Sequence, residues 1–172
     1  MKIINEFIKW KFNINWTLLK IGYYGEKNIL SQLSKQEIYE YSKEILNEID
    51  EEYDLIVQLI SAYDDYEFSE ILNKLAREEN VDYDIQLRKW IVYLVNKELT
   101  NISKDYFEGL MQLTELWISL GLPVECPHII QGKNNTISPE EYYTKETYEL
   151  LLEKNIKWVN DEIFNINMLE KK

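Results

Sequence analysis

The chain has 172 residues, of which 45% are hydrophobic, so it can bury the core of one domain and is unlike a disordered chain. Its net charge is −12, and its single cysteine excludes an internal disulfide framework. No apolar run is as long as a membrane span, and Asn5, Glu6 and two lysines interrupt the segment where a signal peptide would be hydrophobic. We therefore expect a soluble cytoplasmic protein that binds no membrane, with one domain over 1–172 and flexible ends near 1–3 and 168–172.

Two helix starts are readable in the first part of the chain. Asn15 is a candidate N-cap for a short helix that runs through Ile21 and ends near Gly25. Ser34 is followed three places later by Glu37, which predicts a capping box. In such a box, each side chain satisfies a free amide of the new helix end. Apolar residues then recur at helical spacing.

Four more apolar stripes at helical spacing follow, at 55–63, 68–75, 87–95 and 106–120. Glycine and proline are scarce in all of them, so the links between them are short and polar. With the final segment described next, about seven helices are expected. We therefore predict an all-α domain of antiparallel helical hairpins, packed as an irregular bundle or a short helical stack.

The stretch "GLPVECPHIIQGKNNTISPEE", 121–141, holds all three prolines, the only cysteine and the only histidine of the chain. It is first of all a connection, because Gly121 is a natural helix stop and Ser138 with Glu141 predicts a new start. That last helix either continues or restarts at Thr144. A small β-hairpin near 128–137, turning at Gly132 or the asparagine pair, is the one exception to helix. The contribution of the 122–137 loop to binding is left open.

The chemistry-bearing residues of this loop do not form a catalytic motif. Cys126 and His128 lie one residue apart, whereas nucleophilic catalysis usually brings a thiol and an imidazole from separate parts of a chain. One cysteine and one histidine also fall short of a zinc site. No phosphate-binding glycine pattern or calcium loop is present, so no catalytic residue, metal or cofactor is expected. A hydrolase with an unrecognised carboxylate site, or with a site formed by Cys126 and His128, is the third hypothesis.

The negative charge is concentrated in one segment. From Glu37 to Asp84 there are sixteen acidic and three basic residues, a net charge of −13, whereas the rest of the chain is nearly neutral. The simplest interpretation is a solvated surface that aids solubility. The alternative is a docking surface for a basic protein, which would exclude nucleic acid as the ligand there.

The residues predicted to bind a partner are the acidic and tyrosine side chains in the densest part of this segment. They are Asp50, Glu51, Glu52, Tyr53, Asp54, Tyr63, Asp64, Asp65, Tyr66 and Glu67. Charge would speed the encounter, and the tyrosines would supply desolvated anchors. The oligomeric state is not predicted.

The order of these features resembles an uncharacterised bacterial family, the domain of unknown function numbered 2247. The resemblance rests on "INWTLLKIGYYGEKNILS", "EIYEYSKEIL", "EILNKLA", "RKWIVYLVNKEL" and "LTELWISLGLP", and it covers about Phe7 to Phe164. Small acidic helical proteins of this kind are similar to bacterial immunity proteins, which neutralise a cognate toxin domain. The resemblance thus favours a non-catalytic inhibitor of a basic toxin. A helical adaptor that holds a peptide in an aromatic groove is the alternative, because the chain has five Trp and thirteen Tyr.

Overall fold

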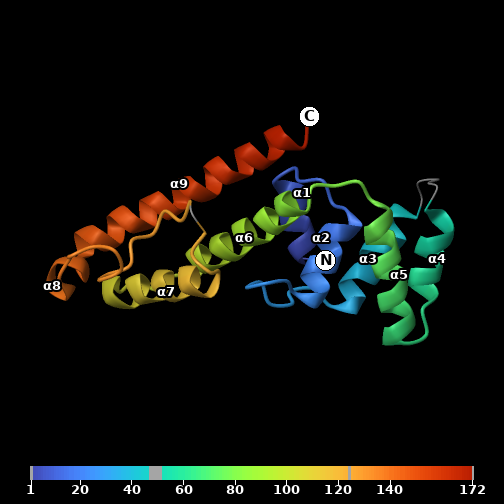
Figure 1. Ribbon diagram of the computed structural model, residues 1–172, viewed down its shortest axis with the longest axis horizontal. Coiled ribbons are helices and arrows are strands. Elements are labelled where there is room, and N and C mark those ends of the chain that lie inside the picture. The colour runs from blue at the N-terminus through green and yellow to red at the C-terminus, as the bar shows by residue number, and fades with distance from the viewer. Residues whose placement is uncertain (1, 47–51, 124, 172) are drawn as a thin grey trace. The chain divides into compact units, whose positions relative to one another are not determined.

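The computed structural model describes residues 2–46, 52–123 and 125–171, and its regular structure in these ranges is helical (Figure 1). The helices are α1 (Lys2–Lys9), α2 (Trp16–Tyr24), α3 (Lys35–Ile45), α4 (Tyr53–Ser61), α5 (Asp65–Glu78), α6 (Tyr83–Thr100), α7 (Tyr106–Ser119), α8 (Pro139–Tyr142) and α9 (Lys145–Leu169). The all-α prediction is confirmed.

The chain divides into two compact units, 1–90 and 91–172, and α6 contains the boundary between them. Each unit has its own buried residues. The helical backbone begins at Lys2, and α9 runs to Leu169.

The first unit is built around α2 and α5, which pack against each other, while α4 contacts both α3 and α5 (Figure 1). Trp90 is completely buried, and its indole N–H donates to the carbonyl of Leu18 at 2.9 Å. The ring of Phe7 meets the Trp90 ring edge-on, with centroids 4.9 Å apart. Phe7 belongs to α1, a helix that the sequence did not predict, and its packing explains why this short segment is ordered.

The predicted helix starts of this unit are confirmed. The Asn15 side chain accepts from the amide of Leu18 at 2.8 Å and caps α2, and Gly25 closes that helix with a φ of 77°. Ser34 and Glu37 form the complete capping box of α3. These contacts are local, which is why the sequence alone could locate them.

The second unit packs α7 against α9. The buried cluster between them includes Leu110, Tyr142, Tyr148 and Leu151. The predicted start at Ser138 is confirmed as a capping box, but it opens only the four-residue helix α8. Thr144 then caps α9 by accepting from the amide of Thr147, so the helix restarts there.

The hairpin predicted near 128–137 is wrong, since none of these residues is in a strand. The side chain of Asn135 organises the loop instead. Its amide donates to the carbonyls of Ile130 and Lys133, and its oxygen accepts from the amides of Gly132 and Ile137. These bonds satisfy the backbone groups that a strand ladder would otherwise have paired.

Candidate functional site

The connection between α4 and α5 presents the most exposed aromatic residues of the predicted binding set. We call Tyr63–Glu67 the α4–α5 turn surface. The side chains of Tyr63 and Tyr66 are 95% and 76% exposed. Asp64, Asp65 and Glu67 are exposed between and beside them. Aromatic rings this exposed present a large apolar area that a partner can bury.

Local hydrogen bonds fix the backbone under these tyrosines. Asp64 caps α5 by accepting from the amide of Glu67 at 2.8 Å, and the Glu67 carboxylate accepts from the amide of Tyr63 at 2.8 Å. The Lys35 ammonium pairs with Asp65 at 3.2 Å and donates to the carbonyl of Asp64 at 3.2 Å. The turn is therefore braced from α3, and two of its carboxylates have structural roles besides their charge.

Three of the other predicted residues, Glu52, Tyr53 and Asp54, lie at the opposite end of α4. Asp50 and Glu51 are outside the described residues. Tyr53 is 46% exposed and begins α4. The nine residues of α4 separate it from the α4–α5 turn surface by roughly 13 Å at the usual helical rise. The structure thus divides the predicted set between two ends of one helix rather than gathering it at one point.

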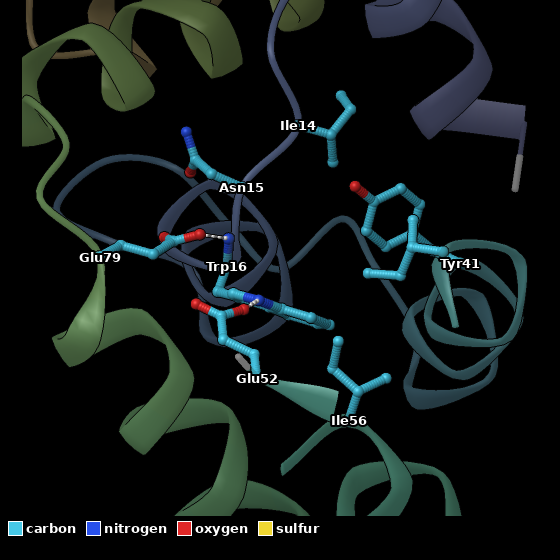
Figure 2. A pocket seen from close by; sticks show the side chains of 8 residues that line it. Ile14, Asn15, Trp16, Tyr41, Glu52, Ile56 and Glu79 are labelled. Atoms are coloured by element: carbon cyan, nitrogen blue, oxygen red, sulfur yellow. Dashed lines mark hydrogen bonds between the residues drawn. The ribbon is translucent and has the colours of Figure 1, made fainter. Parts of the chain in front are cut away.

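Glu52 belongs to a separate feature, a cavity of about 260 Å³ in the first unit. Its carboxylate accepts from the indole N–H of Trp16 at 2.7 Å. Figure 2 shows Glu52 and Glu79 both reaching Trp16, with Tyr41 and Ile56 also lining the cavity. Glu52 is therefore engaged inside its own unit and is not simply an exposed charge.

Glu79 anchors the start of α2. Its carboxylate accepts from the amides of Trp16 at 2.6 Å and Thr17 at 2.8 Å, and from the Thr17 hydroxyl at 3.0 Å. A carboxylate at a helix N-terminus satisfies free amides and complements the helix dipole. Burial nevertheless raises the pKa of Glu79, because desolvation outweighs these hydrogen bonds and the nearby charge of Glu52 acts in the same direction as burial.

Sequence reasoning missed this contact. Glu79 lies 62 residues from Thr17, and nothing in the local pattern distinguishes it from the other acidic residues of the segment. Chemically, the cavity combines two carboxylates with aromatic walls, but both carboxylates already accept hydrogen bonds from the α2 end. Through these hydrogen bonds, Glu79 joins the start of α2 to the end of α5.

The structure also places Cys126 and His128. The Cys126 thiol faces the backbone carbonyl of His128, with Sγ and O 3.7 Å apart, rather than its ring. Burial raises the pKa of the Cys126 thiol, and burial lowers the pKa of His128 to about 4. A thiol held neutral beside a weakly basic imidazole is the reverse of an activated nucleophile. The geometry gives no support to the hydrolase alternative.

Two other features are absent from residues 2–46, 52–123 and 125–171. No group of three or more His, Cys, Asp or Glu side chains there is arranged to hold a metal ion. Among the same residues, no helix combines the length and apolar character needed to cross a membrane.

Comparison with known proteins identifies a family. No curated protein and no solved structure matches the chain. The model of the family described as an uncharacterised protein conserved in bacteria, DUF2247, matches residues 4–163, which is nearly the whole chain. The chain therefore belongs to the DUF2247 family.

Proposed function

We propose that this protein is an immunity-type inhibitor, which binds a basic toxin domain through the α4–α5 turn surface. The observation that carries the proposal is the pair Tyr63 and Tyr66, 95% and 76% exposed among three exposed carboxylates. Tyrosine is enriched at the energetic centres of protein interfaces, because its ring buries a large area while its hydroxyl stays hydrogen-bonded.

The negative charge of this part of the chain indicates the charge of the proposed partner. The 37–84 segment has a net charge of −13, so it attracts a basic protein and repels nucleic acid. This electrostatic attraction raises the association rate. Salt weakens it, because charges more than about 10 Å apart are largely screened at 0.1 M ionic strength. A basic domain whose own substrate is an acidic polymer fits this description, since an acidic protein can occupy the surface that the polymer would use.

The turn surface continues into a hollow of about 370 Å³ lined by residues of α3 and the end of α4. Tyr39, Leu59 and Ala62 are among its walls, and Lys35 connects it to Asp65. A hollow beside exposed tyrosines can receive one apolar side chain of the partner. Binding dominated by this hollow would correspond to the adaptor alternative, whose affinity should survive high salt.

The experiment requires the partner, which can be captured from the native cell with the tagged full-length chain. Association and dissociation rates are then measured at several salt concentrations. The key variants are Tyr63→Ala with Tyr66→Ala, and Asp65→Lys, which reverses a charge and breaks the pair with Lys35. Asp64→Asn removes a charge but keeps a competent N-cap. Glu153→Lys, an exposed charge reversal on α9, is the matched control.

Under the proposal, the double tyrosine variant dissociates at least tenfold faster, as for loss of an interface anchor. Asp65→Lys and Asp64→Asn slow association and flatten its salt dependence, whereas Glu153→Lys changes neither rate. Unchanged kinetics in the tyrosine variant would overturn the assignment of this surface. A captured partner with a net acidic binding domain would overturn the proposed class of toxin.

A further inference from the structure

Residues of the connection between α7 and α8 line an open cavity of about 450 Å³ within the second unit, a volume typical of small-molecule sites. Leu122, Pro123 and Ile129 give it apolar walls, and Cys126 is beside them. His128 lines the same cavity, and its side chain is only 7% exposed. Lys133 also lines the cavity and is itself exposed to solvent.

One polar atom of His128, a residue of the cavity wall, has no partner. Nδ1 of His128 is buried and takes part in no hydrogen bond. Among the buried side-chain nitrogen and oxygen atoms of the described residues, it alone lacks a partner. Leaving such an atom unsatisfied costs about 1–3 kcal/mol, so native proteins rarely tolerate it. We therefore expect the hydrogen-bond partner of this atom to come from outside the chain.

The hydroxyl groups around the ring favour one tautomer of His128. The Tyr142 hydroxyl donates its one proton to the carbonyl of Ile129 at 2.7 Å, so its oxygen can only accept from its other neighbours. Thr114 Oγ1 lies 3.5 Å from the Tyr142 oxygen and 3.0 Å from His128 Nε2, and Nε2 lies 3.2 Å from the Tyr142 oxygen.

These contacts form one chain of hydrogen bonds if Nε2 carries the imidazole proton. Nε2 then donates to Thr114, Thr114 donates to Tyr142, and Tyr142 donates to the carbonyl of Ile129. Every proton then has an acceptor. Burial lowers the pKa of His128 to about 4, so the ring is neutral at pH 7 and holds only this one proton. Nδ1 is then a bare acceptor, and its missing partner is a hydrogen-bond donor.

We propose that this cavity binds a small, neutral, largely apolar molecule that carries one N–H or O–H group, which donates to Nδ1 of His128. The apolar walls recognise the body of the molecule, and the bare nitrogen recognises its donor. Lys133 at the cavity disfavours a cationic ligand. This inference stands apart from the proposed inhibitor function, since none of its residues belongs to the α4–α5 turn surface.

The ligand must displace part of the loop to reach Nδ1, because the atom is covered. Opening the loop breaks some of the Asn135 side-chain bonds that hold it, so burial of the ligand and its hydrogen bond to Nδ1 must offset that loss. The proposal also requires that the contact of Nε2 with Thr114 persists, so that the imidazole keeps its orientation.

The test compares indole with 1-methylindole, which has the same ring system without the donor. Each is titrated into the full-length protein, and the carbon-bound proton signals of the imidazole are followed by NMR. The chain has one histidine, so these signals are unambiguous. Calorimetry on the same samples gives the two dissociation constants.

Indole is expected to bind about tenfold more tightly than 1-methylindole, as for one hydrogen bond to a buried acceptor, and to shift the His128 signals. In His128→Phe, which keeps a ring but no nitrogen, the two ligands should bind equally. Lys133→Gln should improve binding of the cation tryptamine relative to that of indole.

Equal affinities of the wild-type protein for indole and 1-methylindole would overturn the proposal, as would unshifted imidazole signals up to the solubility limit of indole. Both readouts use the unaltered protein, so the conclusion does not depend on the folding of the His128→Phe variant.

Discussion

His128 offers a sharp test of the second unit, because it is the only histidine and is buried in neutral form. Burial lowers its pKa from 6.5 to about 4 in the folded protein, whereas the unfolded chain keeps the ordinary value. The unfolded state therefore binds a proton first as the pH falls. Stability from the neutral buried ring is complete above pH 6.5 and is lost progressively between pH 6.5 and pH 4.

The size of the effect follows from the shift. Each pKa unit corresponds to 1.36 kcal/mol, so the full shift is worth about 3 kcal/mol, and about 2 kcal/mol of it should be lost between pH 7 and pH 5. Cys126 and Tyr142, the titratable neighbours of the ring, have raised pKa values and stay neutral throughout this window.

The assay is urea unfolding at pH 7, 6 and 5 for the wild type and His128→Phe. The variant loses hydrogen bonds at every pH, but it should lack the pH-dependent loss of about 2 kcal/mol. Carboxylates contribute equally to both proteins, so the difference between the two slopes isolates the imidazole. Parallel slopes, or an NMR titration of the folded protein with a midpoint near 6.5, would refute the reasoning.

Three further predictions concern the first unit. Glu79→Ala should lower the free energy of unfolding by about 2 kcal/mol, because it leaves the amides at the start of α2 without an acceptor. Glu79→Gln should lower it less, since the amide side chain keeps one acceptor oxygen. Equal losses of the two variants in urea unfolding would contradict this. Gly22→Ala should cost about 3 kcal/mol or more, since a Cβ there would lie 2.2 Å from the buried ring of Trp90; a melting temperature equal to that of the wild type would show that the core yields. Asp64→Ala should cost about 1 kcal/mol through the lost N-cap, whereas Asp64→Asn should be nearly neutral, and chemical denaturation that ranks the two alike would argue against the cap.

Local features of the chain were readable without a structure. The capping box at Ser34, the Asn15 cap and the helix stop at Gly25 depend on residues within a few positions of one another, and the all-α class follows from apolar spacing. Membership of the family was also visible in the order of short motifs, and the family match over 4–163 supports it.

The misjudged elements share a different cause. α1 is too short to be recognised from its own propensity, and it exists because Phe7 packs against Trp90, 83 positions away. The hairpin near 128–137 was a reasonable interpretation of its turn residues, but Asn135 satisfies the backbone there with its side chain.

The helical class, the positions of the caps and the segment of concentrated negative charge follow from residue types at short range, so the amino-acid sequence was enough to predict them. Which of the charges are exposed depends on the tertiary fold. It assigned Glu52 and Glu79 to the α2 end, left Tyr63 and Tyr66 in solvent, and buried His128 with one nitrogen unpaired. Burial and long-range hydrogen bonding depend on which distant segments meet, and local pattern carries no record of that.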